Sequence, residues 1–107
     1  MINYTTPSIP LLVKGIDLTD GYDVYVTLEQ ENIELTKSGQ DISMVKKTND
    51  TEVTIVLTQE ESAMFRWNAS VMIQVNFIDS DGVRDATNPV TISVMRNLLD
   101  KVIEYGD

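Results

Sequence analysis

The segment at residues 58–65, TQEESAMF, differs in pattern from the chain on either side of it. Thr58 is a preferred helix N-cap, and Glu61 follows three residues later, where its carboxylate can reach back to the Thr58 backbone N–H as a capping box. Apolar residues alternate with other residues at 53–57 and again at 71–77, as in half-buried strands. The pattern predicts a strand, a short helix and a second strand, which is a crossover in a β-sheet protein.

The rest of the chain divides into short strand-like segments separated by turn residues. Strands are predicted at residues 8–14, 22–30, 33–37, 42–46, 52–57, 69–78, 83–87 and 90–95. Pro10 removes a backbone donor and so places the first strand at a sheet edge, while Asp81-Gly82 is typical of a hairpin turn. We expect an all-β fold: an antiparallel, Ig-like β-sandwich of seven or eight strands with one helical crossover.

The predicted core consists of the apolar residues on one face of each strand. They are Val24, Val26, Leu28, Val53, Ile55, Leu57, Val71, Ile73, Val75, Phe77, Ile92 and Val94. In the helical segment, Met64 and Phe65 are also expected to pack inward. Residues 15–21 are predicted to be a loop, because Asp20-Gly21 is a turn signal.

The 107 residues fit a single domain, 1–107, with an N-terminal arm at residues 1–8 and a C-terminal tail at residues 96–107. Leu98, Leu99, Val102 and Ile103 have near-helical spacing in the tail, which allows a short C-terminal helix. Isolated helices below about 12–15 residues are marginal in water. The tail is therefore expected to pack either on its own domain or on a neighbour.

Composition narrows the range of partners. The chain has 17 acidic and 8 basic residues and a formal charge of −9, which argues against nucleic acid and against anionic membrane surfaces. No stretch approaches the ~20 apolar residues of a membrane span. No basic segment precedes the short apolar run at residues 9–13, so no signal peptide is expected. These features favour synthesis in the cytoplasm.

Catalytic constellations are scarce. The chain has no histidine and no cysteine, which excludes Ser-His and Cys-His pairs and thiolate or imidazole metal sites. Glu60 and Glu61 suit helix capping. Asp79, Asp81 and Asp85 suggest a calcium loop, but they lack the EF-hand order, and a hairpin turn explains them better. We predict no catalytic, cofactor or metal site, and a protein that is not an enzyme.

Two other residue sets are candidate sites. The aromatic residues that could line a sugar-binding platform are Tyr4, Tyr22, Tyr25, Trp67 and Tyr105. Only Tyr25 is clearly on a strand face opposite the core, so ordinary packing explains the set better. Glycosylation sequons occur at Asn3, Asn49 and Asn68, and without a secretion signal they are interpreted as chance.

Two long stretches carry a family resemblance: VTIVLTQEESAMF (residues 53–65) and SVMIQVNFIDSDGVRDATNPVTISV (residues 70–94). Together with LTKSGQD at residues 35–41, they resemble small proteins of the structural-gene modules of Firmicute phages and prophages. They are also similar to the N-terminal β-sandwich domain of phage baseplate upper proteins. The resemblance covers about residues 9–103. It departs in the tail, where Lys101 replaces the turn glycine of the family.

The resemblance implies a non-enzymatic virion structural protein, acting in tail or baseplate assembly by protein–protein contacts. The implied partners are other phage structural proteins, with a homo-oligomer also open. The implied location is the virion or the bacterial host cytoplasm. The alternative is a free-standing binding module for cell-surface carbohydrate. The matching motifs are structural, so they transfer no catalytic or ligand-binding residues to this chain.

Overall fold

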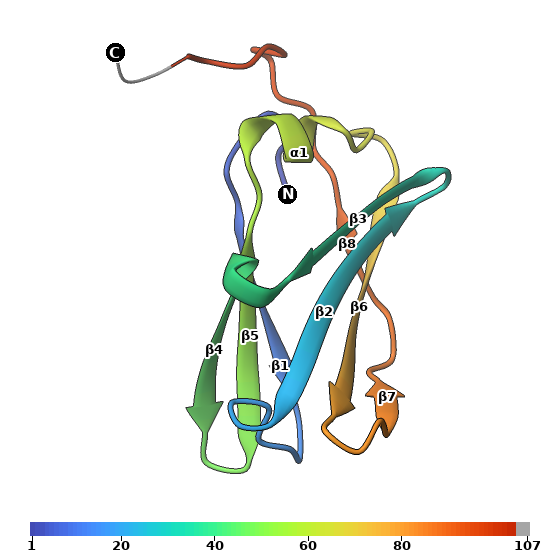
Figure 1. The fold of residues 1–107 in the computed structure, drawn as a ribbon. Helices are drawn as coiled ribbons and strands as arrows, with labels where there is room; N and C mark the ends of the chain where they lie inside the picture. Colours follow the sequence, from blue (N-terminus) through green and yellow to red (C-terminus); the bar gives the residue numbers. More distant parts are fainter. Residues whose placement is uncertain (105–107) are drawn as a thin grey trace.

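The computed structural model describes residues 1–104, which form two packed antiparallel sheets (Figure 1). The first sheet has the order β1 (Ser8–Val13), β5 (Asp50–Val56), β4 (Ile42–Lys47). The second has β3 (Ile33–Ser38), β2 (Tyr22–Gln30) and β6 (Ser70–Asp79), with β7 (Arg84–Ala86) and β8 (Val90–Ser93) pairing the far side of β6. A 3₁₀ turn, η1 (Gly39–Asp41), and a helix, α1 (Gln59–Ala63), connect the sheets. The all-β sandwich predicted from sequence is confirmed.

The pairing order is that of an immunoglobulin-type sandwich without its first strand. In such folds the second strand pairs the fifth and the fifth pairs the fourth, while the third and sixth strands form the centre of the other sheet. Here β1-β5-β4 and β3-β2-β6-β8 reproduce these neighbours. No strand within residues 1–104 pairs the outer side of β1. Pro10 therefore lies on an edge strand, as predicted.

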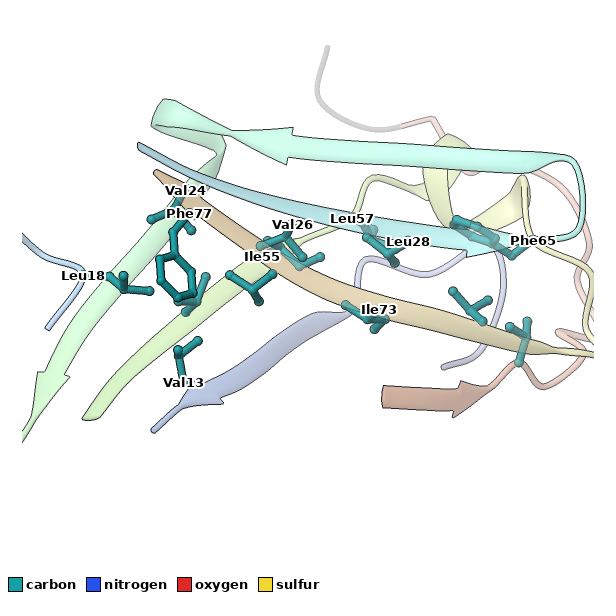
Figure 2. Close-up of a cluster of buried hydrophobic side chains, with 14 residues drawn as sticks. Val13, Leu18, Val24, Val26, Leu28, Ile55, Leu57, Phe65, Ile73 and Phe77 are labelled. Atoms are coloured by element: carbon teal, nitrogen blue, oxygen red, sulfur yellow. The ribbon is translucent and has the colours of Figure 1, made fainter. Parts of the chain in front are cut away.

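The core lies between the sheets and contains the predicted residues (Figure 2). Eleven of the twelve are buried, and the twelfth, Ile92, is half-buried. Val13, Leu18 and Phe65 are also buried, and Figure 2 shows Val13, Leu18 and Phe77 toward the same end of the core. The alternation in each strand therefore identified the inner face correctly, because side chains alternate between the two faces of a sheet.

Leu18 is a core residue supplied by a loop. The loop at residues 14–21 leads from β1 to β2, and Leu18 is fully buried in it. Thr51, a buried residue of β5, explains how the loop is held: its Oγ1 accepts from Leu18 N at 2.9 Å and donates to the Ile16 carbonyl at 2.8 Å. The hydroxyl satisfies loop backbone that burial would otherwise leave unpaired.

The capping box predicted for α1 is present. Thr58 Oγ1 accepts from Glu61 N at 3.1 Å, and Glu61 Oε1 accepts from Thr58 N at 2.9 Å. Phe65 is buried as predicted, but the expectation for Met64 was wrong: 43% of it is exposed. Consecutive residues at a helix end point about 100° apart, so only one of the two can face the core. No helix within residues 1–104 combines the length and apolar character needed to cross a bilayer.

The two terminal segments meet at the α1 end of the sandwich (Figure 1). Ile2 forms a parallel bridge with Met95, supported by hydrogen bonds from Asn3 N to the Met95 carbonyl and from Met95 N to the Met1 carbonyl. The helix allowed for the tail is not present in residues 96–104, which have no regular structure. Residues 105–107 of that predicted tail lie outside the described residues.

Candidate functional site: an apolar surface at the helix end

The carboxylates that the sequence suggested as a possible calcium loop form hydrogen bonds to the backbone of a turn and a strand. Asp79 Oδ1 accepts from Asp81 N and from Val83 N, both at 2.9 Å, and so stabilises the turn between β6 and β7. Gly82 has φ +82° in this turn, a conformation that favours glycine. Asp85 Oδ1 accepts from Ala86 N at 2.8 Å. Residues 1–104 contain no group of three or more side chains placed to hold a metal ion. The absence of enzymatic and metal chemistry remains a prediction.

Glu61 serves the architecture as well. Its Oε1 lies 2.7 Å from Lys37 Nζ, so the ion pair links β3 to α1. Burial works to raise the pKa of Glu61, but the hydrogen bonds from Lys37 and Thr58 and the Lys37 charge outweigh it, so the pKa lies below its ordinary value. Glu60 is exposed beside it. The two carboxylates therefore do not act as a pair.

The aromatic residues do not share one surface. Tyr22 packs edge-on against Phe77, with ring centroids 5.9 Å apart. Tyr25 lies on the outer face of β2, above a shallow hollow whose lining includes Asn76 and Arg84. Trp67 lies beyond α1, with the Arg96 guanidinium 5.8 Å from its ring centroid. Tyr105 falls outside the described residues. Tyr4 lines the same hollow as Trp67, but Tyr22 and Tyr25 do not, so the aromatic residues within residues 1–104 do not form one platform.

The sequon residues also differ in environment. Asn3 is buried, and its Oδ1 accepts from Asn97 N at 2.8 Å, so it fastens the start of the tail. Asn49 and Asn68 are exposed. The interpretation of the sequons as chance matches is consistent with a structural role for Asn3.

The strongest surface feature is a set of exposed apolar side chains at the α1 end, here called the helix-end surface. It consists of Met64, Trp67, Met95, Leu98, Leu99 and Ile103. Leu98 is 90% exposed and Ile103 is 55% exposed, so the tail leaves most of its apolar side chains uncovered. Exposed apolar clusters on small proteins commonly mark interaction sites.

The tail is held against the body by few contacts. The Gln59 side chain bonds the Ile103 backbone twice: Nε2 donates to the carbonyl at 2.8 Å, and Oε1 accepts from the amide at 2.7 Å. Asn97, bonded to Asn3, accepts from Leu99 N at 3.1 Å. A cavity of about 900 Å³ lies between residues 102–104 and the surface that includes residues 4–6 and 56–60. The tail thus crosses the end of the domain but leaves a cavity beneath it.

Sequence reasoning identified part of this surface. The sequence singled out Leu98, Leu99, Val102 and Ile103, because they are apolar residues at near-helical spacing in an otherwise polar tail. Trp67 and Met95 were missed as members of an interaction surface, because no local pattern places them there; the Arg96–Trp67 contact and the Ile2–Met95 bridge are tertiary contacts. Comparison of the chain with protein-family models, with curated proteins and with solved structures finds no match.

Proposed function

We propose that this chain is a non-enzymatic structural or assembly protein that binds other proteins through the helix-end surface. The observation that carries the proposal is the exposure of Leu98, Leu99 and Ile103 on a tail fastened by polar contacts. In a monomer these side chains leave apolar area in water, and burial of such area favours association by roughly 25 cal/mol per Å². A partner surface would supply the missing burial.

The class of partner is proposed from the sequence resemblance. The motifs at residues 53–65 and 70–94 resemble phage and prophage structural modules, so we propose tail or baseplate proteins as partners. The architecture supports this role, because rigid sandwiches carry contacts on loops, edges and terminal segments. The carbohydrate-module alternative is less well supported, since Tyr25 and Trp67 lie on different parts of the surface.

The test compares two pairs of charge substitutions of the same kind. Leu98→Asp with Leu99→Asp alters the helix-end surface, and Val83→Asp with Val45→Asp alters exposed apolar residues away from it. Each variant is mixed with the purified products of the neighbouring genes and analysed by size-exclusion chromatography with light scattering. The first pair should weaken a complex with a tail-module protein at least tenfold, and the second pair should not. Equal binding by both pairs would show that the helix-end surface does not bind the partner. Neighbouring genes for cell-wall or glycoside proteins would favour the carbohydrate alternative.

A further inference from the structure

The outer edge of β1 has backbone groups that its own sheet does not use. Leu57 N donates to the Pro7 carbonyl at 3.1 Å, which makes Pro7–Leu57 a hydrogen-bonded pair at the end of the β1–β5 ladder. An antiparallel ladder bonds at every second residue. The residues whose backbone groups turn away from β5 are therefore Ser8, Pro10 and Leu12. Proline has no N–H, so this edge presents the amides of Ser8 and Leu12 and the carbonyls of all three.

The β1 edge also lacks the charges that the β3 and β4 edges carry, as does the shorter strand β8. Exposed strand edges in natural proteins are commonly blocked by lysine or proline. The β4 edge carries Lys46 and Lys47, and the β3 edge carries Glu34 and Lys37. The sequence of β1, SIPLLV, has no charged residue. Pro10 blocks only one position of this edge.

Two apolar side chains on the inner faces of β8 and β1 are incompletely covered. Val90 pairs with the buried Ile73, so its side chain is on the inner face of β8, yet it is 49% exposed. Leu11 pairs with buried Val53 and is only half-buried. A cavity of about 530 Å³, here called the lateral groove, lies between residues 12–16 and residues 85–88. This is the side on which the first strand of an immunoglobulin-type sandwich would lie.

We propose that the lateral groove binds an extended segment of another polypeptide, which pairs with β1 as an added strand. The free amides and carbonyls of Ser8 and Leu12 specify a strand, because a helix has already used its backbone groups internally. Leu12 lines the groove, and Leu11 and Val90 are incompletely buried apolar residues of the strands β1 and β8. We therefore expect apolar side chains at alternate residues of that segment. The formal charge of −9 favours basic residues flanking it.

This inference goes beyond the proposed function, because it concerns a different surface and a defined mode of binding. The helix-end surface contributes none of the residues that line the lateral groove. The substitutions at Leu98 and Leu99 leave β1 intact, and substitutions in β1 leave the tail intact. Either proposal can therefore fail while the other stands.

The probe is a library of random nine-residue displayed peptides, selected on the full chain, with the selected peptides then synthesised. We expect them to carry apolar residues at every second position. Leu12→Pro, which removes an unpaired amide, should weaken their binding at least tenfold, whereas Leu12→Ala, which keeps the amide, should bind within about twofold of the wild type. Lys46→Pro is the control at the other edge, because its amide also turns away from β5, and it should bind as the wild type does.

Amide hydrogen exchange on the unaltered chain gives a readout that does not depend on how the variants fold. Bound peptide should slow exchange at Ser8 and Leu12 and leave Lys46 unchanged. Failure to select any peptide, equal binding by Leu12→Pro, or no protection at Leu12 would overturn the proposal. Self-association of the wild type that disappears in Leu12→Pro would also overturn it, because a second copy of this chain would then occupy the groove.

Discussion

The side-chain amide of Gln30 both donates a hydrogen bond to the backbone of Arg66 and accepts one from it. Its Nε2 donates to the Arg66 carbonyl at 2.9 Å and its Oε1 accepts from Arg66 N at 2.6 Å, while Nε2 also donates to the Ala69 carbonyl at 3.2 Å. Gln30 is buried at the end of β2. One amide therefore ties the tip of the β2–β3 hairpin to the loop between α1 and β6.

Replacement of Gln30 by leucine should lower the free energy of unfolding by about 1–3 kcal/mol, because buried backbone groups lose their partners. Urea denaturation followed by circular dichroism measures the change. Gln74→Leu is the matched control, since Gln74 makes one hydrogen bond, to the Thr87 carbonyl, from the outer face of β6. A Gln30→Leu cost no larger than that of the control would show that the amide does not anchor the loop.

Replacement of Thr51 by valine keeps the side-chain volume but removes the hydroxyl that holds the Leu18 loop. We expect a loss of about 1–3 kcal/mol and faster amide exchange at Leu18, whose N–H loses its acceptor. Thr54→Val changes the same side chain on the outer face of β5 and should alter stability by less than about 0.5 kcal/mol. Unchanged exchange at Leu18 would contradict the role given to Thr51.

Replacement of Ile73 by alanine tests the packing between the sheets. Ile73 is 1% exposed, so the loss of its side chain should cost about 2–5 kcal/mol through lost burial and a residual cavity. Its neighbour Met72 is 45% exposed on the opposite face, and Met72→Ala should cost less than about 0.5 kcal/mol. Thermal and urea unfolding compare the pair, and similar costs would contradict the inward orientation of Ile73.

The Lys37–Glu61 ion pair should make stability depend on pH. The pKa of Glu61 lies below its ordinary value in the folded chain, so the carboxylate contributes stability at neutral pH. That contribution begins to fall near the ordinary value of 4.5 and is lost as pH drops through the lower folded value. Glu61→Gln keeps a capping-box acceptor and should cost about 0.5–1 kcal/mol at pH 7.

Urea denaturation at several pH values should show the Glu61→Gln variant and the wild type converging in stability as the pH falls below 4.5. Glu60→Gln, at an exposed position beside it, should show a smaller difference at pH 7. A gap between Glu61→Gln and the wild type that stayed constant down to acid pH would mean that the charge of Glu61 does not stabilise the fold.

Local sequence patterns were sufficient for the strands and for α1. The predicted bounds of β2 match the structure, since its alternation is uninterrupted and turn residues bound it. The capping box was readable because both partners lie within four residues. Leu18 was missed because an isolated apolar residue in a loop has no period, and its burial depends on Thr51, 33 residues away.

The tail and the lateral groove depend on tertiary contacts. The spacing of Leu98, Leu99 and Ile103 suits a helix, but Gln59 instead takes up the Ile103 backbone amide and carbonyl. The groove cannot be read from residues 8–13 alone, since its existence requires knowing that no other strand pairs β1. The sequence therefore identified apolar residues that could contact a partner, but not the surfaces on which the fold exposes them.

The β1–β5 pairing has a consequence for synthesis of the chain. Ser8 pairs with Val56, whereas only two residues separate the paired ends of β2 and β3. The partner strand of β1 is therefore synthesised long after β1 itself. Translation at about 5–20 residues per second makes that delay on the order of 2–10 s, whereas sheets of such non-local pairings fold in about milliseconds to seconds. An uncharged strand is thus left without its sheet on the ribosome for seconds, when it can pair with another nascent chain.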